Sequence, residues 1–431
     1  MRNTGSGLRH RVAGLFYGKL ARASAWLFVG GIAGGVLGYV FQVLMGRMLS
    51  TQEYGLFSAM MALIIVLAAP LGTLLMVISR KISEYRARQD VGSIAHFYYS
   101  INIRASVVGA LIFGVYLLFA PQIQSYLKAP SVIPVYLLGA LLFLSIPPAI
   151  NNAFLQGLQR FIWLSASGSF GTLLKIIFAT VLVWLGYGLE GALGGTILAV
   201  IAGWLITYGA LHRPLAAGRG KPFQAAHLSI KPALSVLAAN VAFAAMTQLD
   251  IVLVNYYFPA HEAGLYAAAS ILGKAVMYLP GGIAAALFPM VAENQALSQS
   301  SAHLMLQAVG FTALLSGVGA VFYFLFGERI IVLLYGENYR GAGDVLKFYG
   351  FAIFPMALVM VAEYFLIAQG RVLFAYLFVF TAPLQLTAFY FYHDSLQTVV
   401  AVMGASGLLL VLFGYGLLWR EFKLTRASGR R

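Results

Sequence analysis

The sequence predicts an all-α integral membrane protein with about 12 transmembrane helices in two six-helix lobes, related by a pseudo-twofold axis along the membrane normal. Three observations predict this fold class: an apolar composition, long apolar runs, and a weak repeat between the two halves. Of the 431 residues, 61% are hydrophobic and 10% are charged, whereas a soluble domain carries about 25% charged residues. The runs are continuous over about 20 residues, which favours helices over the alternating strands of a barrel.

A polar connection near the middle of the chain separates the lobes. We expect an N-lobe over residues 24–212, a cytoplasmic linker over 213–231 and a C-lobe over 232–419. A basic amphipathic segment, residues 1–23, precedes them, and a basic cytoplasmic tail, residues 420–431, follows them. The expected spans are residues 24–46, 55–78, 103–120, 132–150, 167–186, 190–211, 232–254, 265–288, 304–326, 346–367, 372–391 and 396–418. The longest connections, about 79–102, 212–231 and 327–345, leave no room for a soluble catalytic domain.

Lysine and arginine counts predict that both termini are cytoplasmic. With the N-terminus inside, inner segments hold 21 of the 28 basic residues and outer loops hold 5; the other two, Lys175 and Lys274, lie within spans. The net charge of +15 is therefore a topology signal with some attraction for anionic lipid heads, and it does not indicate nucleic-acid binding. We expect a multi-pass protein of the inner (plasma) membrane.

Metal and redox chemistry find little support in the sequence. The chain has no cysteine, which excludes disulfides, thiolate chemistry and cysteine metal sites. Its seven histidines fall in predicted loops or tails, which argues against a histidine metal cluster or a buried proton relay. We therefore expect neither a metal site nor a cofactor.

A shift of 209 residues aligns the start of the chain with its second half. Spans 1 and 2 then correspond to spans 7 and 8, and because six spans separate them both halves have the same orientation. Parallel repeats of this kind are typical of transporters whose substrate path lies between the halves. The matched pairs include Glu53 with Glu262, Gly55 with Gly264, Ala59 with Ala268, Gly72 with Gly281 and Glu84 with Glu293.

Several stretches resemble one family, the polysaccharide-biosynthesis (Wzx-like) flippases of the multidrug/oligosaccharidyl-lipid/polysaccharide exporter superfamily. The first outer turn, from Gly46-Arg47-Met48-Leu49 to Glu53-Tyr54-Gly55-Leu56-Phe57, is similar to the turn of that family. The other similar stretches are Asp250 followed by Gly264–Ala269, then Leu287-Phe288-Pro289, and Leu334-Tyr335-Gly336-Glu337-Asn338-Tyr339-Arg340-Gly341-Ala342. The chain departs from the related lipid II flippases, which have fourteen spans and an arginine-rich cavity.

The resemblance implies a flippase that moves an undecaprenyl-pyrophosphate-linked oligosaccharide from the cytoplasmic to the periplasmic leaflet. The implied partners are the polyprenyl-pyrophosphate-linked glycan, membrane lipids, a coupling ion (H⁺ or Na⁺), and a polysaccharide polymerase or glycosyltransferases. One alternative is a multidrug or cation antiporter of the same superfamily, in which acidic residues would dominate the cavity. Another is a membrane enzyme using the charged residues of loop 327–345. We do not expect an enzyme.

Charged side chains inside spans are costly, so each is a candidate functional residue. Lys175 and Lys274 lie near the middle of spans 5 and 8, and an ammonium group suits phosphate. We expect both to bind the substrate, together with Asn240 in span 7. The alternatives are an ion pair or snorkelling toward the interface for Lys175, and pairing with Asp250 for Lys274.

The two acids inside spans are candidates for coupling or gating. Asp250 either binds a coupling cation or proton or neutralises Lys274. Glu363, in span 10, is either a proton or cation site or a carboxylate capped by Tyr364 or Gln369 near the interface.

Two further gating candidates, Arg47 and Glu53, lie in the first outer turn. We expect them to help an outer gate close, with a topology anchor as the alternative for Arg47. Elsewhere, Pro147 and Pro148 predict a break in span 4.

Overall fold

The computed structural model describes residues 30–223, 233–281, 291, 302–368 and 373–428, and every regular element in this part is a helix. Nine stretches of the described residues are long and apolar enough to cross a membrane. The predicted all-α membrane fold is therefore confirmed. The predicted amphipathic segment 1–23 and the stretch Leu287-Phe288-Pro289 lie outside the described residues.

The helices group into two compact units. Unit 1 comprises Met1–Phe41, Leu74–Leu118 and Gly139–Ser229, and unit 2 comprises Gln42–Thr73, Phe119–Leu138 and Ile230–Arg431. The boundaries fall inside three helices, which contribute to both units: Gly30–Met48, α2 (Thr51–Ala87) and α5 (Ile133–Leu144).

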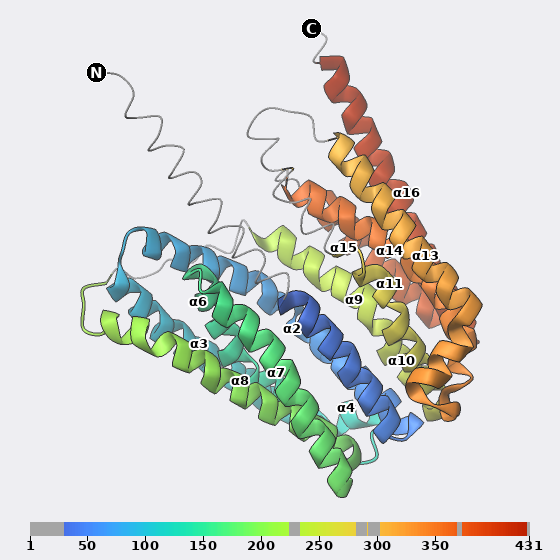
Figure 1. Cartoon of the computed structure of the whole chain (residues 1–431), viewed down its shortest axis with the longest axis horizontal. Coiled ribbons are helices and arrows are strands. Elements are labelled where there is room, and N and C mark those ends of the chain that lie inside the picture. Colours follow the sequence, from blue (N-terminus) through green and yellow to red (C-terminus); the bar gives the residue numbers. More distant parts are fainter. Residues whose placement is uncertain (1–29, 224–232, 282–290, 292–301, 369–372, 429–431) are drawn as a thin grey trace. The chain divides into compact units, whose positions relative to one another are not determined.

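Unit 1 is built on a helical hairpin. The hairpin consists of α7 (Phe161–Leu182) and α8 (Gly188–Gly218) (Figure 1). The unit also contains α3 (Val91–Leu118) and α6 (Ile146–Gly157). The chain reverses at Gly186, whose φ of 94° lies in the region that favours glycine. A β-carbon on Gly195 would overlap the backbone of Ala179, so the two helices touch closely. The stretch Phe161–Gly218 thus supplies two of the expected spans.

Aromatic and aliphatic side chains from four helices form the core of unit 1. Phe97 and Tyr98 of α3 pack against Phe154 of α6, with ring centroids 5.8 and 5.1 Å apart. The remaining members of the cluster come from α2, α3, α6 and α8: Ile78, Ile82, Tyr85, Ile94, Ile150, Ala153, Leu155, Ala210, Leu211 and Leu215. This core fixes α6 and α8, which carry part of the candidate site.

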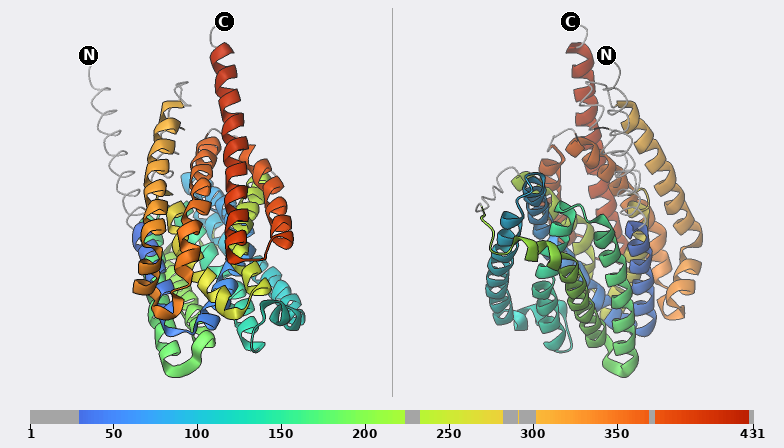
Figure 2. Two further views of the ribbon diagram at one scale, coloured as in Figure 1. Left: turned by 90° about the vertical axis from the view of Figure 1, so that its right-hand side faces the viewer. Right: turned by 60° about the vertical axis from the view of Figure 1, so that its left-hand side comes forward.

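Unit 2 is organised around α14 (Ala342–Ala368). This helix packs between α13 (Ala302–Tyr335) and α16 (Leu396–Ser428) (Figure 2), and 72% of its most apolar window is buried. Most spans are far more exposed: in α3 the share is 6%, which is the pattern of a helix facing lipid. The other helices of unit 2 are α4 (Ala120–Leu127), α9 (Leu234–Tyr257), α10 (Ala260–Gly273), α11 (Ala275–Tyr278) and α15 (Leu373–Phe391).

The connections are shorter than predicted, because helices continue past their apolar runs. Residues 79–102, expected as a connection, are almost wholly helical, since α2 ends at Ala87 and α3 begins at Val91. Asp90 caps α3: its Oδ1 accepts the backbone N–H of Ser93 (2.9 Å) and its Oδ2 accepts the hydroxyl (2.6 Å). These hydrogen bonds hold the pKa of the Asp90 carboxyl below its usual value. A helix therefore continues beyond the end of its apolar run.

The break predicted at Pro147 and Pro148 falls at Ser145, between α5 and α6. Proline is tolerated in the first turn of a helix, where its missing N–H has no partner to lose. The two prolines therefore begin α6 rather than interrupt it.

Candidate functional site

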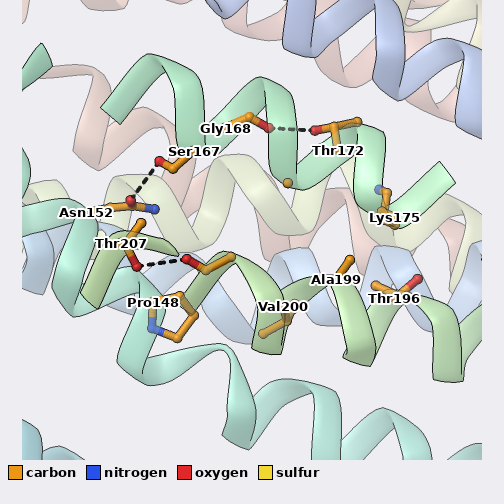
Figure 3. Close-up of a pocket in the computed structure, with 12 residues that line it drawn as sticks. Pro148, Asn152, Ser167, Gly168, Thr172, Lys175, Thr196, Ala199, Val200 and Thr207 are labelled. Carbon is orange, nitrogen blue, oxygen red and sulfur yellow. Dashed lines mark hydrogen bonds between the residues drawn. The ribbon is translucent and has the colours of Figure 1, made fainter. Parts of the chain in front are cut away.

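A cavity of about 240 Å³ lies inside unit 1, between α6, α7 and α8 (Figure 3). Helix α7 contributes Ser167, Thr172 and Lys175, and the facing helix α8 contributes Thr196 and Thr207. Asn152 of α6 lies at one end. The cavity therefore combines one cation with several hydroxyl groups and one amide.

Lys175 is the charged residue of this cavity. Among the described residues it has no acidic partner, and its ammonium lies 4.0 Å from the ring centroid of Phe41, a cation–π contact. Such contacts stabilise a cation without neutralising it. An unneutralised cation beside hydroxyl groups suits an anionic, hydroxyl-bearing ligand, although the substrate-binding role of Lys175 stays a prediction.

In unit 2, Lys274 and Asp250 form a buried ion pair. Lys274 is 4% exposed and Asp250 is fully buried, and Lys274 Nζ lies 3.3 Å from Oδ1 of Asp250. The ammonium also donates to Oε1 of Gln248 at 3.4 Å. The pairing that the sequence left open is thus present in this structure, and a phosphate would have to displace it to reach Lys274.

Three hydroxyl groups complete the surroundings of the Asp250 carboxylate. Its Oδ2 accepts from Tyr266 (3.1 Å), Ser270 (3.0 Å) and Tyr349 (2.9 Å). Counting the ammonium, four donors surround one buried carboxylate, which is the compensation that a buried charge requires.

A glycine sets the position of one of these donors. A β-carbon on Gly273 would overlap the ring of Tyr349, so the ring rests directly on the backbone beside Lys274. This contact brings the Tyr349 hydroxyl of α14 to Asp250 of α9. The space that Gly273 leaves is filled by an aromatic ring.

The other two candidates inside spans have simpler environments. Asn240 of α9 donates its amide to Oγ1 of Thr73 in α2 at 3.0 Å. Glu363 of α14 has no hydrogen bond or ion pair with any described residue, and Gln369, one of its two suggested caps, lies outside them. The substrate role of Asn240 and the coupling role of Glu363 stay predictions.

Glu53 forms a capping box at the start of α2. Its carboxylate accepts from the backbone N–H (3.0 Å) and hydroxyl (2.8 Å) of Ser50, and the Ser50 hydroxyl oxygen accepts the N–H of Glu53 (3.2 Å). This motif satisfies N–H groups that have no partner within the helix. Glu53 therefore has a structural role here, while its gating role stays a prediction.

Arg47 caps the C-terminal end of a helix, whereas Glu53 caps an N-terminal end. Its guanidinium donates to the carbonyl oxygens of Leu333 and Leu334, the latter at 2.6 Å, at the C-terminal end of α13. A cation is stabilised there by the helix dipole. The turn that contains Arg47 is thereby bound to the C-terminal end of α13.

Tyrosines extend this contact between two motifs that are far apart in the sequence. Tyr54 and Tyr335 share a hydrogen bond of 3.1 Å, and a β-carbon on Gly46 would overlap the Tyr335 ring. Tyr339 packs against both rings, with centroids 5.9 and 5.3 Å away. The Gly46–Phe57 turn and the Leu334–Ala342 loop thus form one packed cluster.

Charged residues near the C-terminal end of α13 and in the segment that follows it form salt bridges with one another. Arg340 bonds Glu328 at 2.7 Å and Glu337 at 2.8 Å, and Lys347 bonds Asp344 at 2.7 Å. Hydrogen bonding and charge from Glu337, with the charge of Glu328, raise the pKa of Arg340 above its usual value. These acids neutralise neighbouring bases.

Sequence reasoning missed several polar residues around the candidates. Tyr266, Ser270 and Lys274 recur every four residues, which places them on one face of a helix, and this spacing was a usable signal. No comparable signal marked Tyr349, which is 99 residues from Asp250. The hydroxyl residues of the unit 1 cavity were also missed, because single hydroxyls in apolar helices form no pattern.

Comparison with known proteins places the chain in a recognised group. Residues 44–344 match a family described as "Polysaccharide biosynthesis protein", while a search of curated proteins found no match. An inward-facing multidrug resistance MATE family transporter of the MOP superfamily is similar in structure, with a TM-score of 0.73 and 16% identity over 92% of this chain and 96% of that one. The lipid II flippase MurJ, in an inward closed conformation, gives 0.69 and 13% over 91% and 87%. These structural matches establish a shared transporter fold.

Proposed function

The chain belongs to the polysaccharide biosynthesis protein family, and on that premise we propose that it flips an undecaprenyl-pyrophosphate-linked oligosaccharide from the cytoplasmic to the periplasmic leaflet. Flipping would proceed by alternating access of the two lobes. The glycan would serve the synthesis or export of a cell-surface polysaccharide. Glycosyltransferases would supply the substrate and a polymerase would consume it.

The observation that carries this proposal is the polar cavity of unit 1. A sugar-pyrophosphate head group needs a cation for phosphate and hydrogen-bonding groups for hydroxyls, and the cavity offers Lys175 together with hydroxyl side chains. Its volume of about 240 Å³ is below the ~300 Å³ of the smallest usual ligand pockets. We infer that it accepts one part of the head group, while the polyprenyl chain stays in lipid.

The buried pair of unit 2 supports a coupling role. If a proton or Na⁺ neutralised the Asp250 carboxylate, Lys274 would lose its partner and its ammonium would be free for phosphate. Binding of the coupling ion and of the substrate would then favour each other. Glu363, which has no hydrogen bond or ion pair with any described residue, is the second candidate for the coupling ion.

Translocation in liposomes tests the proposal. Full-length protein should move a fluorescent polyprenyl-pyrophosphate oligosaccharide between leaflets, and Lys175→Ala should slow this about tenfold or more because a phosphate contact is lost. Lys347→Ala, which removes a half-buried lysine paired with Asp344, is the matched control and should flip normally. Wild-type rates for Lys175→Ala would show that the lysine does not contact the head group.

A multidrug or cation antiporter is the second candidate, favoured by the two acids inside spans, Asp250 and Glu363, and by the fold shared with MATE transporters. The cation in the unit 1 cavity argues against it, because an ammonium repels cationic drugs. Ion-driven efflux of a cationic dye from liposomes that fail to flip the glycolipid would establish this alternative and overturn the first.

A further inference from the structure

The hydroxyl groups that line the unit 1 cavity already donate hydrogen bonds to backbone carbonyl groups. Thr172 donates to the carbonyl oxygen of Gly168 at 2.9 Å (Figure 3). Thr196 donates to the carbonyl oxygen of Ala192 at 2.8 Å. Ser167 donates to Leu164 at 2.9 Å. This bonding to the preceding turn is common for serine and threonine in apolar helices. These hydroxyl oxygens can therefore only accept hydrogen bonds from a ligand in the cavity.

A lining of lone pairs selects its ligand by chemistry. Ionised phosphate oxygens only accept hydrogen bonds, so they find no donor at such positions. A sugar hydroxyl carries a proton and binds there well. The donors of the lining are Lys175 and the amide of Asn152, whose Oδ1 lies 3.4 Å from the Ser167 hydroxyl. One part of the cavity, lined by acceptor oxygens, therefore suits ligand hydroxyl groups, and another part, beside Lys175, suits an anion.

The shape of the wall fits a ring. Gly168, Gly171 and Gly203 line the cavity, and a β-carbon on any of them would meet no described atom within 4 Å. The helix surfaces are consequently flat there, which lets a six-membered ring lie against α7 and α8. Bulky side chains at these positions would fill the space.

We propose that this cavity is a subsite for a single sugar ring, whose hydroxyls donate to Ser167, Thr172 and Thr196 while Lys175 contacts an anionic group next to that ring. The assignment rests on the proposed function and adds which part of the glycolipid the cavity selects. The anion is either the pyrophosphate that joins the sugar to the lipid or a carboxylate on an acidic sugar. Both place negative charge beside a hydroxyl-bearing ring.

Binding of defined lipids to the purified full-length protein tests the subsite. The probes are polyprenyl pyrophosphate, the same lipid carrying one hexose, and the same lipid carrying one uronic acid. Thr172→Val and Thr196→Val remove one oxygen each at nearly constant volume. Each should weaken binding of the hexose lipid about fivefold, the loss of one hydrogen bond, and leave the sugar-free lipid unchanged.

Matched variants separate this effect from general damage. Thr247→Val removes a hydroxyl bonded in the same way, to Phe243 at 2.8 Å, but outside the cavity, and should change neither affinity. Thr172→Ser and Thr196→Ser keep the oxygen and should keep the preference for the hexose lipid. Equal losses for both lipids, or an unchanged preference in the valine variants, would overturn the subsite.

Lys175→Met identifies the anion. Weaker binding of all three lipids assigns the pyrophosphate, and weaker binding of the uronic acid lipid alone assigns the sugar carboxylate; no change in any overturns the contact. The translocation assay distinguishes the two proposals. Protein that prefers the hexose lipid but never flips it contradicts the flippase function alone. Valine variants that flip normally with an unchanged preference contradict the subsite alone.

Discussion

Gly55 of α2 packs directly against Gly264 of α10: a β-carbon on Gly55 would lie 2.7 Å from the backbone nitrogen of Gly264. The 209-residue shift pairs these same two positions. Equivalent positions meet one another where a twofold or pseudo-twofold axis passes through a contact. The repeat read from the sequence thus has a physical point of contact within unit 2.

Gly264→Ala should destabilise this crossing. The added methyl group would overlap the carbonyl oxygen of Thr51, and backbone atoms cannot move aside as a side chain can. We expect a loss of about 1–3 kcal/mol, measured as a lower thermal unfolding midpoint in detergent. Gly72→Ala, in α2 where a β-carbon meets nothing within 4 Å, is the control and should leave the midpoint unchanged or raise it.

Lys274→Met alone should be more harmful than its combination with Asp250→Asn. The single change leaves a carboxylate fully buried without its cation, at a cost of about 3–5 kcal/mol. The double change removes both charges and should recover much of that loss. Thermal unfolding of the two variants compares them directly, and a double variant as unstable as the sum of its parts would argue that the pair is not coupled.

Gly273→Ala should act on Asp250 through Tyr349. In the structure the Tyr349 hydroxyl donates to the Asp250 carboxylate at 2.9 Å. The new methyl group would displace the tyrosine ring and move this hydroxyl away from the carboxylate. Tyr349→Phe removes the same hydrogen bond and should cost about 1–2 kcal/mol. A double-mutant cycle measured by thermal unfolding should therefore be non-additive. Additive losses would show that Gly273 acts by another route.

The cap of α3 should lose strength in acid. Because Ser93 holds the pKa of Asp90 below its usual value, the ionised cap contributes fully above the unfolded-state pKa of about 4. That contribution disappears as the pH falls through the lower folded-state pKa. Partial exposure limits it to about 1 kcal/mol. Unfolding midpoints between pH 7 and pH 3 should converge for wild type and Asp90→Ala, and a constant difference would contradict this account.

Local sequence predicted the helices well and their ends poorly. Apolar runs of about 20 residues specify spans, because unpaired backbone groups cannot enter hydrocarbon. The ends of the helices depend on caps such as Asp90 with Ser93 and Ser50 with Glu53. These add polar turns beyond the membrane, which hydropathy alone does not register.

The sequence by itself determined the class of protein, the rare charges inside spans and the resemblance to a polysaccharide flippase, because hydropathy and short motifs are local properties. Only the tertiary structure decided the partners. It joined Lys274 to Asp250, seated Tyr349 on Gly273, and left Lys175 against Phe41 in a cavity of hydroxyls. Such pairings follow from how helices pack, and the residues that meet across two helices are fixed by crossing points that no single stretch of sequence encodes.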